Sequence, residues 1–466
     1  MSVYPRNLST FLNRLSGYNK NNVKMNVLGS TKANQGDVIQ VDLPTNSIVD
    51  LSSLAWSFDV KYSSTGANTK VHHLPINAES IISRLAVEVN GQTLVNLTNY
   101  NTLYHALLYM TATEDYQRQR MVAQANIQGG GVKLANNGVG DAVVNGTVQE
   151  LTSLDAGGAN TQVTTRRHVI DTWLGFLGSA KPNFIDTSLL GNVRITITLA
   201  NGDIVGGDDA GSSSVFEVDK QHFSVDVVSI SDGVYDAMVD QMLASGAPIE
   251  IPFKNYFSFA STQTSMAQTT AFNVASQSID RMWAIARQTG AAGVGAEGYN
   301  KSEATKITTA PPHPIVVDNP AYFNYSTCNG TGFHFQVNNT LYPQWTSDNP
   351  QDFWQHTKLA VGDQGNMLAG AYPAALSHYM DNFFVYACEL QHRTDGDERY
   401  ISGIDTRGAA AQCYFNSTQS PATDDLDTSH ALRNRAGTAV PNQILVWAEV
   451  TSSLRIMANK VVEIVQ

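Results

Sequence analysis

The chain has 466 residues, more than one ordinary hydrophobic core holds, so its length predicts two domains. Charged residues make up 15%, against roughly 25% in typical soluble proteins, and the formal net charge of -12 argues against nucleic-acid binding by the body of the protein. The low charge content fits a protein that buries much of its surface against copies of itself. It equally fits an extracellular all-β protein with many polar loops.

The cysteines and the apolar segments indicate the compartment in which the chain folds. Three cysteines without a Cys-x-x-Cys spacing indicate no disulfide framework and folding in a reducing compartment; they are Cys328, Cys388 and Cys413. No apolar run approaches the length of a membrane span, and the N-terminal segment lacks the apolar stretch of a signal peptide.

The first 36 residues differ from the rest of the chain. They contain no acidic residue and five basic ones: Arg6, Arg14, Lys20, Lys24 and Lys32. Four apolar residues have the spacing of one helical face, and Gly17 is placed to end that helix; they are Leu8, Phe11, Leu12 and Leu15. This pattern predicts a basic N-terminal arm, residues 1–36, outside the main fold.

Strand patterns dominate from residue 37 onward. Candidate strands are "GDVIQVDLP", "SLAWSFDVKY", "NVRITITLA" and "HFSVDVVSIS". Residues 85–89 alternate between apolar and polar, and Asn90-Gly91 follows as a strong hairpin signal. The period then becomes helical over 98–110, behind a cap at Thr98 or Asn99. A second helix is expected after Asp232, with one face formed by Val234, Met238 and Met242.

The same pattern starts again after the break at Ser245-Gly246-Ala247-Pro248. "PIEIPFKNYFSFAST" predicts a strand pair or one long bent strand, and Asn338-Asn339 predicts a turn after the alternating residues 333–337. Asn349 and Pro350 predict the start of a helix over 350–361, closed by Gly362. Gly-rich, loop-like insertions occupy 127–162 and 288–319. We interpret the chain as an internal duplication, with one unit at 37–245 and another at 246–466, although chance in an all-β chain also explains such a pattern.

A duplicated strand-rich unit with a helix after its fourth or fifth strand resembles the double jelly-roll major capsid proteins of tailless icosahedral viruses. Three stretches carry the resemblance: the strand, turn and helix at 84–108, "DTWLGFLGSAKPNFIDTSLLGNVRITITLAN" with a short Trp-containing strand, and "HFSVDVVSISDGVYDAMVDQMLASGAPIEIPF" as the link between the rolls. The implied fold is all-β, with two tandem jelly-roll β-sandwiches, each with an inserted helix.

The resemblance implies a structural function. Such proteins form pseudo-hexameric homotrimers that tile an icosahedral shell, so the chain would be made in the host cytoplasm and located in the virion. The Gly-rich insertions would form outer loops. The arm would lie on the inner face and contact minor capsid or penton proteins or an internal membrane, through Arg6, Leu8, Phe11, Leu12, Arg14 and Leu15.

Motifs for catalysis, metal binding or cofactors are weak. "GVGAEG" matches Gly-x-Gly-x-x-Gly but lacks a leading strand and a following helix. "TDGDER" and "TDDLD" could hold Ca²⁺, yet Asp-rich surface turns are commoner, and His72-His73 is a bare pair. Several glycosylation triplets occur, including those that begin at Asn145, Asn329 and Asn416. We therefore expect no enzyme, no cofactor and no metal, with an extracellular carbohydrate-binding or glycoside-cleaving β-sandwich protein, or a viral spike or adhesin, as alternatives to a shell subunit.

Overall fold

The computed structural model describes residues 18–66, 72–73, 77–111, 120, 123–124, 132–133, 143–144, 160–204, 206–207, 213–230, 234–246, 248–263, 265–288, 323, 325, 327, 330–361, 379–380, 384–391, 403–407, 412–419, 442–457 and 461–466.

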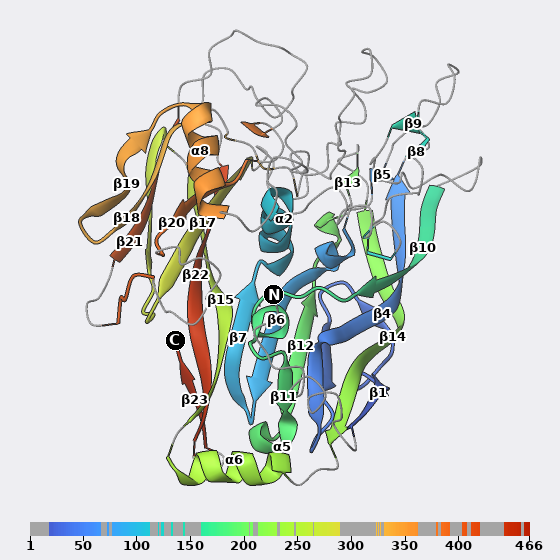
Figure 1. Cartoon of the computed structure of the whole chain (residues 1–466). Helices are drawn as coiled ribbons and strands as arrows, with labels where there is room; N and C mark the ends of the chain where they lie inside the picture. The colour runs from blue at the N-terminus through green and yellow to red at the C-terminus, as the bar shows by residue number, and fades with distance from the viewer. Residues whose placement is uncertain are drawn as a thin grey trace, which may run out of the picture.

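The first half of the described chain forms two antiparallel sheets that face each other (Figure 1). One sheet has the strand order β1-β14-β4-β10, and the other has the order β3-β12-β6-β7. The strands are β1 (Tyr18–Met25), β3 (Val38–Asp42), β4 (Ile48–Gly66), β6 (Ile82–Val89), β7 (Gln92–Thr98), β10 (Asn160–Ile170), β12 (Val193–Leu199) and β14 (Ser213–Ile230).

The second half forms another pair of antiparallel sheets. Their strand orders are β15-β22-β17-β20 and β16-β21-β18-β19, and β23 (Val461–Val465) adds to β22. The strands are β15 (Ile249–Gln263), β16 (Ala267–Asn273), β17 (Ile279–Gln288), β18 (Gly330–Val337), β19 (Thr340–Ser347), β20 (Tyr386–Glu389), β21 (Gln412–Gln419) and β22 (Asn442–Met457).

The two halves have the same topology. When the eight main strands of each half are counted in chain order, one sheet reads first-eighth-third-sixth and the other second-seventh-fourth-fifth, in both halves. A jelly roll consists of two packed antiparallel sheets with eight strands in total. In each half a 12-residue helix follows the fifth strand: α2 (Tyr100–Thr111) and α8 (Pro350–Val361). The predicted fold of two tandem jelly rolls, each with its helix, is confirmed.

Shorter elements connect these strands. Helix α6 (Val234–Ala244) runs beneath both sandwiches in Figure 1 and links the first roll to the second. The short helices are η1 (Ala78–Ile81), α4 (Phe176–Ser179), α5 (Thr187–Leu190) and η2 (Gly202–Ile204), and the short strands are β2 (Ala33–Asn34), β5 (His72–His73), β8 (Val132–Lys133), β9 (Val143–Val144), β11 (Phe184–Asp186) and β13 (Gly206–Gly207).

A hairpin residue is braced in the same way in both rolls. Asn90 and Asn338 each follow the fourth strand, with φ of 50° and 53°, in the left-handed region that Asn tolerates better than most residues. The Asn90 backbone N–H donates to the Asn192 carbonyl at 2.9 Å, and the Asn192 N–H donates to Asn90 Oδ1 at 3.1 Å. Asn338 makes the same two bonds with Gln412, at 2.8 and 3.2 Å. The duplication thus extends to individual residues.

Alternating side chains build the core. On β12 the four apolar residues at alternate positions are buried, as the alternation predicts: Val193, Ile195, Ile197 and Leu199. On α8, Phe353, Thr357, Ala360 and Val361 are buried and Trp354 packs against the core, so the helix predicted over 350–361 has one apolar face against the sandwich. The Asp352 N–H donates to Asn349 Oδ1 at 3.0 Å, which makes Asn349 the N-cap.

The two rolls pack against each other through the first strand of the second roll. Strand β15 contacts β7, and Asn99 Nδ2 donates to Ser258 Oγ at 3.0 Å. Phe176 of α4 meets Phe253 of β15 edge to face, with ring centroids 5.3 Å apart. The buried apolar side chains of both rolls form one continuous cluster. The interface between the rolls is therefore partly an extension of the core.

The predicted arm extends too far along the chain. Strand β1 pairs with β14 over its full length, and β2 also pairs with β14, so residues 18–34 contribute to the first roll instead of lying outside it. The physical reason is the uninterrupted backbone pairing of β1 with β14, together with the burial of Met25, Val27 and Ala33 in the core. Lys20 Nζ also lies 2.8 Å from Asp226 Oδ2 and 3.1 Å from Asp50 Oδ2. Hydrogen bonds to these carboxylates raise the pKa of Lys20. Residues 1–17, with the predicted arm helix, lie outside the described residues.

The structure corrects two further local predictions and decides a third, which had left open a strand pair or one long strand. The Trp-containing segment before α4 is not a strand: Trp173 lies in an irregular connection, buried, with its indole N–H donating to the Leu54 carbonyl at 2.9 Å. "PIEIPFKNYFSFAST" forms the single strand β15, because it pairs with β22 without interruption. On α6 the buried face contains Leu243, with Val239 partly buried, whereas Met242 is 45% exposed.

Candidate assembly surfaces

The sheet β16-β21-β18-β19 of the second roll carries no Asp, Glu, Lys or Arg on any of its four strands. The sheet with the same topology in the first roll, β3-β12-β6-β7, does carry charges, namely Asp42, Arg84, Glu88 and Arg194. Burying an unpaired charge is costly, so an uncharged polar face is the easier one to cover with another protein surface. The second roll thus presents the better candidate contact face.

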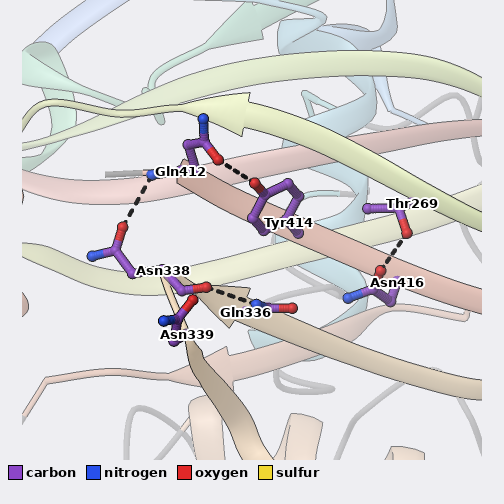
Figure 2. A pocket seen from close by; sticks show the side chains of 7 residues that line it. All are labelled: Thr269, Gln336, Asn338, Asn339, Gln412, Tyr414 and Asn416. Atoms are coloured by element: carbon purple, nitrogen blue, oxygen red, sulfur yellow. Dashed lines mark hydrogen bonds between the residues drawn. The ribbon is translucent and has the colours of Figure 1, made fainter. Parts of the chain in front are cut away.

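A polar pocket of about 390 Å³ lies on this face (Figure 2). Its lining consists of five carboxamides, a threonine and a tyrosine: Gln336, Asn338, Asn339, Gln412, Asn416, Thr269 and Tyr414. Their hydrogen bonds to one another fix several of these groups. Thr269 Oγ1 donates to Asn416 Oδ1 at 2.5 Å, Gln336 Nε2 donates to the Asn338 carbonyl at 2.6 Å, and the Tyr414 hydroxyl donates to Gln412 Oε1.

The groups that line the pocket are suited to binding a partner and not to catalysis. Carboxamides and hydroxyls offer uncharged donors and acceptors, and no carboxylate or amine lines the pocket. Asn416, which begins one of the glycosylation triplets, also donates through Nδ2 to His334 Nε2 at 3.0 Å. This surface can hold neutral polar groups of a partner.

Exposed apolar side chains lie beside the same sheet. Trp345 on the edge strand β19 is 49% exposed, and Leu359 on α8 is 51% exposed. The Trp345 ring lies 5.0 Å from the His356 ring of α8, which links strand and helix. Pro343 also lies on β19, and a proline on an edge strand removes a donor that another strand could pair with. The edge therefore favours side-chain contact over strand addition.

Several buried ionisable groups are held by structural partners. Arg120 Nη2 lies 2.6 Å from Glu79 Oε2, and Arg120 Nη1 donates to the Tyr104 hydroxyl at 2.7 Å. In the second roll Glu449 accepts from the Trp283 indole N–H at 2.9 Å and from Arg281 at 3.3 Å. Buried polar groups with such partners stabilise a unique packing and do not by themselves indicate a reactive site.

The cysteines offer no reactive thiolate in the described part of the chain. Cys388 and Cys413 are free. Burial raises the pKa of Cys388 to about 12 and that of Cys413 to about 11. Both thiols are therefore protonated at neutral pH. Cys328 lies outside the described residues.

The remaining sequence candidates are placed as follows. The six arm residues proposed to contact a partner or membrane lie outside the described residues, as do "GVGAEG", both Asp-rich turns, Asn145 and Asn329. His72-His73 forms the two-residue strand β5, paired with β13. Within the described ranges, no group of three or more His, Cys, Asp or Glu side chains could hold a metal ion. No helix that the structure describes is long and apolar enough to cross a membrane.

Comparison with known proteins gives a structural likeness without a sequence relative. No family model matches the chain, and no curated protein matches it. The PBCV-1 virus capsid is similar with a TM-score of 0.57 and 13% identity, over 100% of this chain and 99% of that chain. The Faustovirus major capsid protein has a TM-score of 0.55 and 10% identity, over 94% and 90%. A chain of the Sputnik virophage has a TM-score of 0.54 and 11% identity, over 96% and 89%. The chain therefore has the double jelly-roll fold of viral major capsid proteins.

Proposed function

We propose that this chain is a structural major capsid protein, three copies of which form a pseudo-hexameric capsomer of an icosahedral viral shell. The observation that carries the proposal is the repeated topology: one chain supplies two sandwiches with the same strand order. Three chains around a threefold axis then supply six similar units, and a hexagonal unit can tile a shell. The likeness of the fold to capsid proteins over nearly the full chain length supports this assignment.

The surface chemistry supports extensive self-contact. The chain is poor in charged residues, and the face of the sheet β16-β21-β18-β19 has none of the four charged residue types. The cores of protein interfaces are depleted in charge in the same way. The chain itself is accordingly the main partner, first in the trimer and then in the lattice, and the virion is its location.

The proposal includes no enzymatic activity. The pocket on the second roll has no nucleophile with a neighbouring base among its lining residues, and the buried carboxylates Glu79 and Glu449 are engaged by arginines. We assign residues 18–245 to the first jelly roll and 246–466 to the second, which leaves 1–17 as the arm. Arg6, Leu8, Phe11, Leu12, Arg14 and Leu15 then contact minor capsid or penton proteins or an internal membrane.

Native mass spectrometry of the purified full chain at two salt concentrations tests the assembly. We expect a trimer of about 150 kDa from three chains of 50.5 kDa. The trimer should persist at moderate salt, since exposed ion pairs, which salt screens, are not its main support. Deletion of residues 2–17 should leave the trimer and its melting temperature unchanged and impair shell formation. A monomer at micromolar concentration at both salt concentrations would refute the proposal.

One observation favours a second candidate function, carbohydrate binding. The pocket in Figure 2 combines five carboxamides with a tyrosine, groups that can hydrogen-bond a neutral sugar. Saturation-transfer NMR with glucose, galactose and N-acetylglucosamine tests this alternative. Binding by a monomeric protein, lost in the double variant Gln336→Ala/Asn339→Ala, would favour it over the shell subunit. A trimer without sugar binding would exclude it for these sugars.

A further inference from the structure

The two braced hairpins align the rolls residue by residue at the polar pocket. Asn90 in the first roll corresponds to Asn338 in the second, because each exchanges the same pair of hydrogen bonds with a residue at the start of the seventh strand. Two residues further along that strand, Arg194 in the first roll corresponds to Tyr414 in the second. The duplicated chain thus shows what each roll places at the position of the pocket.

In the first roll an ion pair occupies this position. Arg194 lies between Asp42 of β3 and Glu88 of β6 in the strand register. Its Nε donates to Asp42 Oδ1 at 2.7 Å, and its Nη2 donates to Asp42 Oδ2 at 3.1 Å. These hydrogen bonds to Asp42, with the charges of Asp42 and Glu88, raise the pKa of Arg194. A bidentate ion pair therefore covers the sheet of the first roll at this point.

In the second roll the same position has uncharged residues. Tyr414 lies between Ala271 of β16 and Gln336 of β18 in the strand register. The Tyr414 hydroxyl donates to Gln412 Oε1 on its own strand, and Ala271 has no polar side-chain group that could bridge to it. Where the first roll has its ion pair, the second roll therefore has the polar pocket of Figure 2.

The carboxamides of this pocket keep hydrogen-bonding atoms for a ligand. Gln336 donates through Nε2 to the Asn338 carbonyl, which leaves Gln336 Oε1 as an acceptor. Asn338 Oδ1 accepts from the Gln412 backbone N–H, which leaves Asn338 Nδ2 as a donor. Gln412 Oε1 accepts from the Tyr414 hydroxyl, which leaves Gln412 Nε2 as a second donor. Within the described residues, these bonds fix the orientation of each carboxamide and aim its other atom at a partner.

We propose that this pocket binds the acetamido group of a neutral N-acetylated sugar while the chain serves as a shell subunit. An acetamido group has one N–H donor and one carbonyl acceptor on separate atoms. It can therefore donate to Gln336 Oε1 and accept from Asn338 Nδ2 or Gln412 Nε2 at the same time. A hydroxyl group has its donor and acceptor on one oxygen and spans less of the pocket. A volume of about 390 Å³ is in the range of small-molecule sites.

Charge sets a second condition on the ligand. The four strands that carry the pocket have no Lys or Arg, so they offer no cationic partner to a sugar carboxylate. The chain as a whole has a net charge of -12, which disfavours an anion further. A neutral acetamido sugar is accordingly the ligand class, and an acidic sugar with the same acetamido group is excluded.

The first roll shows that this face stays accessible beside a neighbouring roll. Strand β7, at the edge of the first roll's sheet, contacts β15 of the second roll. The side chains of Arg194 and Asp42 on the same sheet nevertheless remain 35% and 30% exposed. If the rolls of the trimer have equivalent surroundings, the pocket remains open in the assembled trimer. In this respect the inference rests on the proposed function.

Saturation-transfer NMR of the full-length protein tests the inference, with the oligomeric state measured by native mass spectrometry in the same buffer. The probes are N-acetylglucosamine, N-acetylgalactosamine, glucose, galactose and N-acetylneuraminic acid. We expect transfer to the two neutral acetamido sugars and an affinity at least about fivefold lower for the two hexoses, which lose one hydrogen bond. We expect no transfer to N-acetylneuraminic acid, because its carboxylate has no cationic partner at the pocket.

Two reciprocal double variants locate the site. Ala271→Asp/Tyr414→Arg brings the ion pair of the first roll into the second, at positions that face each other in the same register, and should abolish transfer. The control, Asp42→Ala/Arg194→Tyr, makes the opposite exchange in the first roll and should leave transfer unchanged. Melting temperatures close to that of the wild type show that both variants fold. A smaller change, Gln336→Ala, removes the proposed acceptor and should lower the affinity at least about fivefold.

The outcomes separate this inference from the proposed function. A wild-type trimer without transfer to either neutral acetamido sugar, or with equal affinity for N-acetylglucosamine and glucose, overturns the inference alone. Unchanged transfer in both Ala271→Asp/Tyr414→Arg and Gln336→Ala overturns it as well, because the sugar then binds elsewhere. A monomeric wild-type chain refutes the shell function, whereas transfer to that monomer, lost in Ala271→Asp/Tyr414→Arg, still supports the sugar site.

Discussion

Acid should destabilise the folded chain through His105. This side chain is fully buried on α2; its Nδ1 donates to the Asn101 carbonyl at 2.7 Å, and its Nε2 lies 3.3 Å from Ser80 Oγ. Burial, with a smaller contribution from the nearby positive charge of Arg120, lowers the pKa of His105 to about 3, although the hydrogen bond to Asn101 opposes this shift. Arg120 is itself paired with Glu79. The native state therefore holds this imidazole neutral.

The sign and size of the change in unfolding free energy follow from the linkage between folding and proton binding. The unfolded chain binds the proton near the ordinary pKa of about 6.5, and the native chain binds it only near the lowered value, so stability falls as pH drops through this window. At pH 4.5 the unfolded histidine is almost fully protonated and the native one is not. The resulting loss of unfolding free energy, relative to pH 7, is about 2.5 kcal/mol from this one residue.

Urea unfolding of the full chain, followed by tryptophan fluorescence at pH 7 and pH 4.5, measures the effect in the wild type and in His105→Gln. Other groups also titrate in this range, but they are common to both proteins and cancel in the comparison. The wild type should lose about 2.5 kcal/mol more than the variant between the two pH values. An equal loss in both proteins would show that His105 does not stay neutral in the native state, and the reasoning would fail.

Two further changes probe the packing of each roll. Glu79→Gln should lower the unfolding free energy by about 3–5 kcal/mol, because it leaves the buried guanidinium of Arg120 without its carboxylate; a loss below about 1 kcal/mol in urea unfolding would contradict this. Asn349→Ala should cost about 1 kcal/mol by removing the α8 N-cap acceptor of the Asp352 N–H, whereas Gln351→Ala in the same first turn should cost almost nothing; equal melting temperatures of the two variants would contradict the capping assignment.

The sequence predicted the structure best where a local pattern, such as strand alternation, a turn residue or helical spacing, agrees with the tertiary fold. Alternation at 193–199 marks a strand with one buried face, and the structure buries those four residues. The two Asn-containing turns could be predicted because few residues other than Gly accept a left-handed backbone there. The helices at 98–110 and 350–361 were predictable because each buries an apolar stripe at helical spacing. Together these repeated elements were sufficient to predict the duplication.

Prediction failed where long-range partners decide the structure. Strand β1 has the sequence "YNKNNVKM", which shows no clear alternation. It forms a strand because its backbone pairs with β14, and Lys20 forms ion pairs with Asp50 and Asp226. Trp173 looked like a strand residue, yet it lies buried in an irregular connection, where its indole N–H donates to the Leu54 carbonyl.

Negative-stain electron microscopy of the purified full chain tests the central claim most directly. If three copies each contribute two equivalent jelly rolls, projections down the threefold axis should show six similar lobes in a hexagonal outline. Isolated two-lobed particles, or assemblies whose lobes are not related by a pseudo-sixfold arrangement, would contradict the account.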